Sequence, residues 1–112
     1  MEQPSRSEFV IVLTTVDATV DHPSIATTLV AERLAACVNA LPVMTSTYRW
    51  KGGVETASER QLVIKTTAAR LPELLHRIGE LHPYDVPELL VLPVSDVEAG
   101  YGRWLREAVG PS

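Results

Sequence analysis

Residues 81–94 read LHPYDVPELLVLPV and combine a helix end, a stiff turn and a strand. Pro83 disfavours helical geometry at His82, so the preceding helix is expected to end there. Pro87 suits the first position of a strand, where a missing N–H is tolerated. The His82 imidazole precedes the first proline, a phenol (Tyr84) and a carboxylate (Asp85) lie between the two prolines, and Glu88 follows the second. Polar residues on a turn between rigid elements are typical of a binding site, so this turn is the first candidate.

Length and composition describe one ordinary globular domain. The chain has 112 residues, of which 46% are hydrophobic and 21% charged, and its formal net charge is −4. We expect a single domain over residues 1–112, with residues 1–7 disordered. No cluster of Lys or Arg occurs, which argues against nucleic acid and membranes as partners. A lone cysteine, Cys37, and the lack of a long apolar run favour the cytoplasm.

The hydrophobic patterns predict seven elements in the order β-α-β-β-α-β-α. The expected strands are 9–15, 36–50, 54–66 and 88–94, and the expected helices are 24–34, 71–81 and 97–109. Asp21 is expected to cap the first helix and Asp96 the last. This order predicts an α+β fold, a ferredoxin-like split βαβ sandwich. Its sheet would be antiparallel with helices on one face, and the last helix would be an addition.

The predicted second and third strands form a hairpin that is too long for the domain. Lys51-Gly52-Gly53 supplies the turn, in which we expect positive φ at Gly53. Residues 38–50 would span about 43 Å, against a diameter of about 34 Å for a domain of this size. An overhanging ribbon leaves unpaired edges, which favours an oligomer. The alternative is that Pro42 breaks the strand into two ordinary pieces.

No strong catalytic nucleophile or phosphate-binding loop is visible. Cys37 follows a predicted helix C-terminus in apolar surroundings, where a thiol is usually a small buried hydrophobe. The serines lack a G-x-S-x-G elbow, and the chain lacks G-x-G-x-x-G and Walker motifs. An acylphosphatase would need a glycine-cradled arginine after the first strand, and none is present. We therefore expect no enzymatic activity.

The turn after the second helix also fits a metal site. His82 has Asp85 and Glu88 within six residues, and imidazole with carboxylate suits Cu²⁺ or Zn²⁺. The same residues also fit a purely structural role, in which His82 complements a helix C-terminus and Glu88 pairs with a nearby group. Spacing alone favours the structural role, because polar turn residues are common in every fold.

A second set of residues favours a ligand pocket between subunits. Three aromatic side chains would supply its walls and one lysine a cation for an anionic ligand: Tyr48, Trp50, Tyr84 and Lys65. The aromatic pair of the last helix, Tyr101 and Trp104, is instead expected to pack in the core.

Four segments together resemble the CutA family of divalent-cation tolerance proteins. They read LVAERLAACVN (29–39), YRWKG (48–52), IKTT (64–67) and HPYDVPEL (82–89), and they occur in the family's order. The resemblance runs from about residue 12 to residue 105. It implies a ferredoxin-like homotrimer joined through the 38–66 hairpin, with an architecture similar to PII signalling proteins. It also implies tolerance to copper and other divalent cations, metal binding, and no settled enzymatic activity.

The resemblance further implies the site residues. His82 and Glu88 match the family's proposed metal-binding histidine and glutamate, and Cys37 matches a recurrent cysteine. Some members have another cysteine in the first strand, where this chain has Leu13-Thr14-Thr15, which disfavours Cu⁺. The expected ion is therefore Cu²⁺ or another divalent cation such as Zn²⁺. The alternative is a PII-like sensor that binds an anionic small molecule in the intersubunit cleft.

Overall fold

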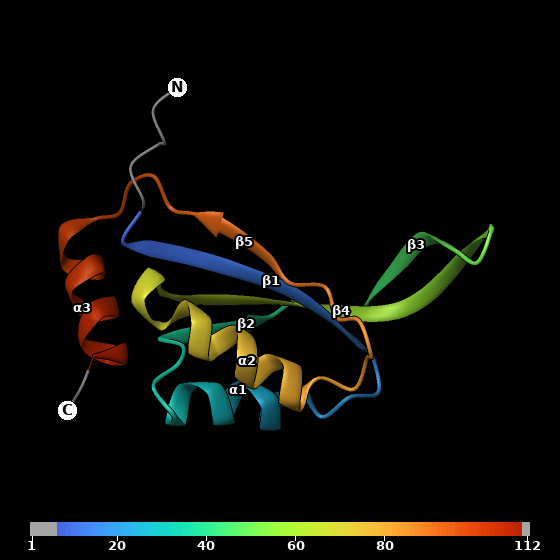
Figure 1. Cartoon of the computed structure of the whole chain (residues 1–112), viewed down its shortest axis with the longest axis horizontal. Coiled ribbons are helices and arrows are strands. Elements are labelled where there is room, and N and C mark those ends of the chain that lie inside the picture. The colour runs from blue at the N-terminus through green and yellow to red at the C-terminus, as the bar shows by residue number, and fades with distance from the viewer. Residues whose placement is uncertain (1–6, 111–112) are drawn as a thin grey trace.

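The computed structural model describes residues 7–110, and its elements follow the predicted order except that one strand is divided (Figure 1). The strands are β1 Phe9–Asp17, β2 Cys37–Ala40, β3 Met44–Trp50, β4 Gly53–Thr67 and β5 Leu90–Pro93. The helices are α1 His22–Ala31, α2 Leu71–Leu81 and α3 Ala99–Val109, with a 3₁₀ turn at Ala68–Arg70. The α+β class is confirmed.

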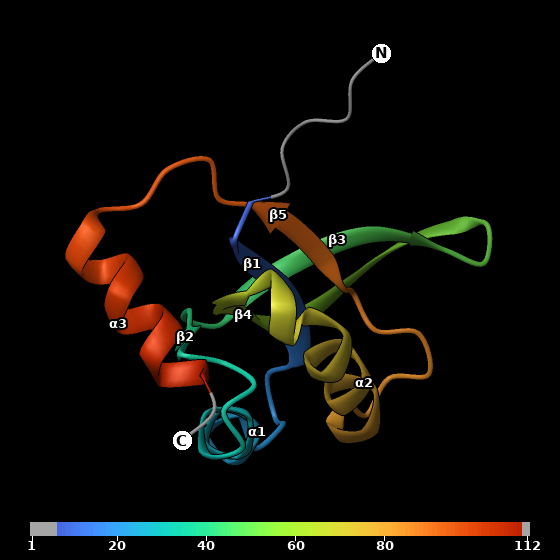
Figure 2. The same ribbon diagram turned by 60° about the vertical axis from the view of Figure 1, so that its left-hand side comes forward.

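The five strands form one antiparallel sheet, as predicted. Its order is β2-β4-β1-β5, and β3 pairs with the outer part of β4. β1 and β4 pair along their common length, from Phe9 opposite Thr67 to Asp17 opposite Glu59. α1 and α2 cover one face of the sheet (Figures 1 and 2). The core between them is made of buried aliphatic side chains that include Val12, Val16, Leu29, Leu62, Ile64, Leu74 and Ile78.

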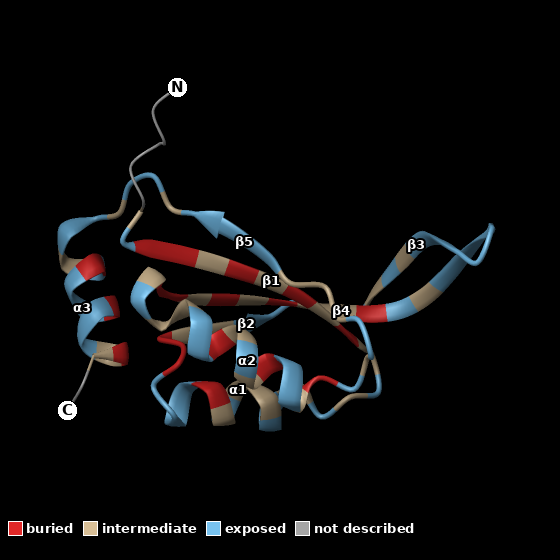
Figure 3. Ribbon diagram, in the orientation of Figure 1, coloured by how far each residue is buried: buried red, intermediate tan, exposed pale blue. Residues whose placement is uncertain are grey.

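The opposite face of the sheet carries apolar side chains that no helix covers along its middle. Residues paired across antiparallel strands point to the same face, and those on this face include Ile11, Leu13, Val63, Leu90 and Leu92. We call these five residues the open face. Leu90 and Leu92 are 54% and 43% exposed. In Figure 3 β5 is exposed along its length, while β1 beside it alternates between buried and partly buried residues.

Two predicted helix ends are confirmed. The Asp21 carboxylate accepts a hydrogen bond from the Ser24 N–H at 3.2 Å, and Pro23 lies in the first turn of α1. α2 ends at Leu81, and His82 is extended with φ −79° and ψ 133°. The proline at position 83 therefore stops the helix where the sequence predicts.

α3 differs from its prediction in its start and in the aromatic part of its buried face. Its N-cap is Glu98, whose carboxylate accepts from the N–H groups of Gly100 and Tyr101, so the Asp96 cap was wrong. These two hydrogen bonds lower the pKa of Glu98. The buried residues are Gly102, Leu105 and Val109, whereas the aromatic pair is 41% (Tyr101) and 45% (Trp104) exposed. Core packing of that pair was wrong because the face with Gly102, which allows close approach to a phenylalanine ring at position 9, turns inward.

The hairpin follows the alternative in which Pro42 breaks the strand, yet it still leaves the body. Residues 44–57, here called the arm, project beyond the rest of the molecule (Figures 1 and 2). The radius of gyration is 15.2 Å, larger than the roughly 13 Å of a compact domain of this length. Positive φ falls on Lys51 (48°) and Gly52 (81°), so the expectation for Gly53 was wrong. Both central residues of this two-residue turn need positive φ, and Gly53 already belongs to β4.

The disorder expected for residues 1–7 falls largely on residues 1–6, which lie outside the described residues. Ser7 is held in place, because its hydroxyl donates to the carbonyl oxygens of Phe9, at 2.7 Å, and Val94. Within residues 7–110, none of the helices has the length and apolar character needed to cross a membrane.

Candidate functional site

His82 is buried beside β1, just beyond Leu13, the last β1 residue that pairs with β5. Its Nδ1 accepts a hydrogen bond from the Tyr84 N–H at 3.1 Å, so this nitrogen carries no proton. Nε2 therefore carries the proton and donates to the Thr15 carbonyl oxygen at 2.7 Å. The neutral ring thus makes a hydrogen bond to the free edge of β1 and another to the backbone of the turn that follows.

Tyr84 joins the same turn to β4. Its hydroxyl donates to Glu59 Oε2 at 2.8 Å, and its ring lies 4.7 Å from the His82 ring, centroid to centroid. Glu59 is only 9% exposed, so the phenol supplies a hydrogen bond that a buried carboxylate needs. Burial, and then the hydrogen bond to Glu59, raise the pKa of Tyr84, with smaller contributions from Asp17 and Tyr48.

Glu88 makes the third contact between the turn and the sheet. Gln61 Nε2 donates to Glu88 Oε2 at 3.0 Å and to the Thr14 carbonyl oxygen at 2.8 Å. The polar residues of the turn and their β4 partners form one group, here called the turn cluster: Glu59, Gln61, His82, Tyr84 and Glu88. The hydrogen bonds of His82 Nε2, the Tyr84 hydroxyl and Glu88 tie the 82–88 segment to the end of β1 and to the middle of β4.

Sequence reasoning found three members of the turn cluster and missed two. Glu59 and Gln61 lie in β4, which pairs with β1 over Phe9–Asp17. They are separated from the turn by more than twenty positions along the chain. A buried glutamate is unusual, because carboxylates are rarely buried unless paired. The one available signal is that Glu59 and Gln61 alternate with residues of the core-facing side of β4, which places them on the opposite face.

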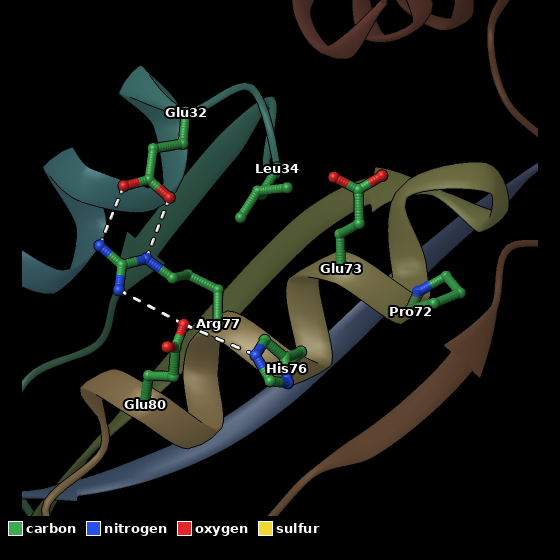
Figure 4. A pocket seen from close by; sticks show the side chains of 7 residues that line it. All are labelled: Glu32, Leu34, Pro72, Glu73, His76, Arg77 and Glu80. Carbon is green, nitrogen blue, oxygen red and sulfur yellow. Dashed lines mark hydrogen bonds and ion pairs between the residues drawn. The ribbon is translucent and has the colours of Figure 1, made fainter.

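A separate cleft of about 480 Å³ lies between the end of α1 and α2 (Figure 4). Its charged lining is self-paired, because the Arg77 guanidinium lies 3.0 Å from each carboxylate oxygen of Glu32 and 3.5 Å from Glu80. The ion pair with Glu32 raises the pKa of Arg77. His76 on the same helix is solvated, with 81% of its side chain exposed. None of the predicted site residues lines this cleft.

Comparison with known proteins gives the relationship of the chain. The family model described as "CutA1 divalent ion tolerance protein" matches residues 10–108. The chain belongs to this family. The divalent-cation tolerance protein CutA of Thermus thermophilus is 47% identical over 100 residues, covering 89% of this chain and 97% of that protein. The Escherichia coli protein of the same name is 38% identical over 108 residues, covering 96% of each.

A solved family structure has the same fold. The divalent cation tolerance protein Cut A1 from Thermus thermophilus superposes with a TM-score of 0.86 at 46% identity, covering 91% of this chain and 99% of that chain. The projecting arm and the turn cluster are thus features of a chain that matches this CutA1 structure over nearly its whole length.

The three predicted metal ligands do not come together within one CutA1 chain. Both ring nitrogens of His82 are engaged by backbone groups, and Glu88 holds Gln61. Cys37 lies opposite Lys65, four positions along β4 from Gln61, or about 13 Å. Among residues 7–110 no group of three or more His, Cys, Asp and Glu side chains is arranged to hold a metal ion. The described part of a single chain therefore offers no set of three ligands for a divalent ion.

The predicted pocket residues are also spread along the sheet. Trp50 pairs with Gly53 at the tip of the arm, and Lys65 lies near the other end of β4. Twelve positions separate residues 53 and 65, which corresponds to about 40 Å along an extended strand. Tyr48 and Tyr84 lie between these extremes. These side chains can line one pocket only if more than one copy of the chain contributes.

Proposed function

We propose that this protein is a cytoplasmic, non-enzymatic homotrimer that takes part in tolerance of divalent cations by binding copper or another divalent ion. Membership in the CutA1 family supports the role in cation tolerance. The choice of ligand rests on the charges of the turn cluster, and the homotrimer on the surfaces that one chain leaves uncovered. The cytoplasmic location and the lack of enzymatic activity rest on the sequence, which has a lone cysteine and no G-x-S-x-G or phosphate-loop motif.

The charge of the turn cluster is the observation that carries the choice of ligand. The ionised side chains that act on the Tyr84 hydroxyl are carboxylates, those of Glu59 and Asp17. Asp85 and Glu88 add two more within the turn. Four carboxylates around one turn attract a cation and repel an anion, and carboxylate oxygen is a ligand for divalent ions. Lys65, the cation required by the anion alternative, is six positions along β4 from Glu59, about 20 Å away.

Two uncovered surfaces support a homotrimer. The open face presents a continuous set of aliphatic side chains, which soluble proteins normally cover. Within the arm, β3 and β4 pair only with each other. The outer edges of both strands are therefore unpaired within residues 7–110 of one chain. The strand order, with its two helices on one face, supports the ferredoxin-like classification and the similarity to PII-like trimers.

Metal binding in this proposal requires a second copy of the chain. His82 would exchange one backbone hydrogen bond for the ion, and Glu88 would offer Oε1, which has no hydrogen-bond partner among residues 7–110. Cys37 is too far along the sheet to join these two residues in its own chain, so it would bind from a neighbouring copy or at a separate position.

Calorimetric titration with Cu²⁺ and with Zn²⁺ tests this site. Glu88→Gln keeps an acceptor for Gln61 but removes the charge, so it is expected to weaken binding at least tenfold; His82→Ala and Cys37→Ser complete the set. His76→Ala is the matched control, because His76 is an exposed imidazole on α2. Affinity that is unchanged in both His82→Ala and Glu88→Gln would reject the site. Light scattering that gives the mass of one chain at micromolar concentration would reject the homotrimer.

A PII-like sensor of an anionic small molecule is the second candidate. The observation in its favour is the exposed aromatic surface of the arm, where Tyr48 is 40% and Trp50 54% exposed and the Lys51 ammonium lies 6.0 Å from the Trp50 ring centroid. Lys65 and Tyr84 would have to come from other copies. A thermal-shift screen with nucleotides and organic anions tests it, and the absence of any shift would count against it.

A further inference from the structure

The arm leaves the body of the protein at a break in the strand that pairs with β4. The last pair of β2 is Ala40 with Leu62, and the first pair of β3 is Met44 with Glu59. Three residues, 41–43, therefore face two residues of β4, 60 and 61. One extra residue of this kind is a bulge, which bends the strand and increases its twist. The break thus decides the direction in which the arm projects.

Residues 41–43 themselves keep one backbone hydrogen bond to β4. The Leu41 N–H donates to the Gln61 carbonyl oxygen at 2.9 Å, and Pro42 has no N–H to donate. Among the described residues, no backbone N–H outside the strands donates to the Leu41 carbonyl oxygen. The Arg60 side chain does so instead, since its Nη1 lies 2.9 Å from that oxygen. The Arg60 side chain thus replaces the backbone hydrogen bond that the bulge removes.

The Arg60 guanidinium is committed to this position. Its Nε is buried and has no hydrogen-bond partner within residues 7–110. An arginine that was free to move would turn this group to water, so the unpaired Nε indicates that the side chain is held in place. Its backbone is fixed in the middle of β4, opposite Val16 of β1. The next residue toward the tip, Glu59, is bound by Tyr84. Beyond this point the arm projects away from the body (Figures 1 and 2).

We infer that Arg60 is the positioning residue that sets the direction of the arm. The planar guanidinium spans from β4 to the Leu41 carbonyl and holds the bulge in one geometry. An arm held in one direction presents its free edges to a second copy of the chain at a fixed angle. Only this consequence for assembly rests on the proposed homotrimer. In a single chain, the same brace keeps β3 paired with β4 next to the break.

Arg60→Met tests the inference because methionine keeps much of the aliphatic stem and removes the hydrogen bond. Arg103→Met is the matched control, since Arg103 is an exposed arginine on α3 and the charge change is the same. Hydrogen exchange is expected to become roughly five- to tenfold faster in Arg60→Met at the amides of Leu41 and β3. Exchange at β1 amides should stay unchanged. Light scattering on both variants should show weaker assembly of Arg60→Met alone.

The outcomes separate the two proposals. Exchange in the arm that is equal in Arg60→Met and Arg103→Met overturns the positioning role. A wild-type protein that runs as one chain overturns the homotrimer, and the exchange rates then still decide the role of Arg60. Arg60→Lys, which retains the charge but not the planar fork, provides the same readout if Arg60→Met does not fold. An increase in exchange in the arm is expected for it as well, and equality with wild type in every arm amide overturns the inference.

Discussion

The turn cluster and the arm use their polar and aromatic residues in opposite ways. In the turn cluster, His82, Tyr84 and Glu88 each bind a group of the same chain, and both nitrogens of the imidazole are engaged. In the arm, Tyr48 and Trp50 are among the exposed large side chains, and Val54 is 70% exposed. The two regions join at Glu59, which pairs with the first residue of β3 and accepts from the Tyr84 hydroxyl.

This difference shows that a cluster of chemically capable residues is not by itself an unoccupied site. The turn residues hold the end of β1 to β4, so in a single chain they act first as structure. The arm residues have no such task within residues 7–110, and their surface is available to another molecule. Function that involves the turn therefore needs either a second copy or a rearranged hydrogen bond, and the following predictions test how firmly each region is held.

The largest effect is expected for His82→Ala. The substitution removes a buried ring and leaves the Thr15 carbonyl and the Tyr84 N–H without their partner. We expect the free energy of unfolding to fall by about 2–3 kcal/mol. Guanidinium denaturation at a fixed protein concentration measures it. His76→Ala removes an exposed imidazole and should leave the midpoint nearly unchanged; equal effects of the two substitutions would show that His82 is not a structural anchor.

Tyr84→Phe is expected to have a smaller, pH-dependent effect. At neutral pH the loss of the hydroxyl leaves the buried Glu59 carboxylate without its donor, at a cost of about 1.5 kcal/mol. Because burial and Glu59 raise the pKa of Tyr84, its stabilisation is complete below the ordinary tyrosine pKa of about 10. It is lost as the pH rises from there toward the folded-state pKa, by up to about 1.4 kcal/mol per pH unit.

Denaturation between pH 8 and pH 11 measures this dependence. The stability difference between wild type and Tyr84→Phe should be constant up to about pH 10 and then shrink. Tyr101→Phe controls for the loss of a hydroxyl from an exposed ring on α3. A difference that stays constant through pH 11 would contradict the argument that the Tyr84 phenol is held neutral.

The sequence predicts those parts of the fold that depend on neighbouring residues. Pro83 stops α2 and Asp21 caps α1, because each acts within one turn of its own position. The partners of His82 and Tyr84 depend on the β1–β4 register, which brings Thr15 and Glu59 to the turn. This register cannot be predicted from the residues next to the turn. The fold class followed from local patterns, whereas the composition of the turn cluster required contacts between distant segments.

The burial of α3 shows a second limit of sequence patterns. Two faces of this helix carry apolar residues, and the larger aromatic pair made one of them the natural choice for the core. The structure buries Gly102 with Leu105 and Val109 instead. A glycine allows the helix to approach the Phe9 ring closely, since a Cβ at position 102 would lie 3.4 Å from it. Close packing, rather than hydrophobic area alone, sets the rotation of the helix.

The smallest expected effect lies at the tip of the arm and compares two adjacent glycines. Gly52 has φ +81°, where an L-residue is strained, whereas a Cβ at Gly53 would meet only the Trp50 carbonyl oxygen at 3.8 Å. Gly52→Ala is therefore expected to lower the free energy of unfolding by about 1 kcal/mol, and Gly53→Ala by less than about 0.5 kcal/mol. Thermal unfolding of both variants under identical conditions measures the difference. Equal losses would indicate that the tip is not held in the Lys51-Gly52 turn, and a larger loss for Gly53→Ala would restore the expectation drawn from the glycine pair. Because the tip is remote from the turn cluster, the binding of Cu²⁺ by Gly52→Ala should change only if the arm of one copy reaches the turn cluster of another.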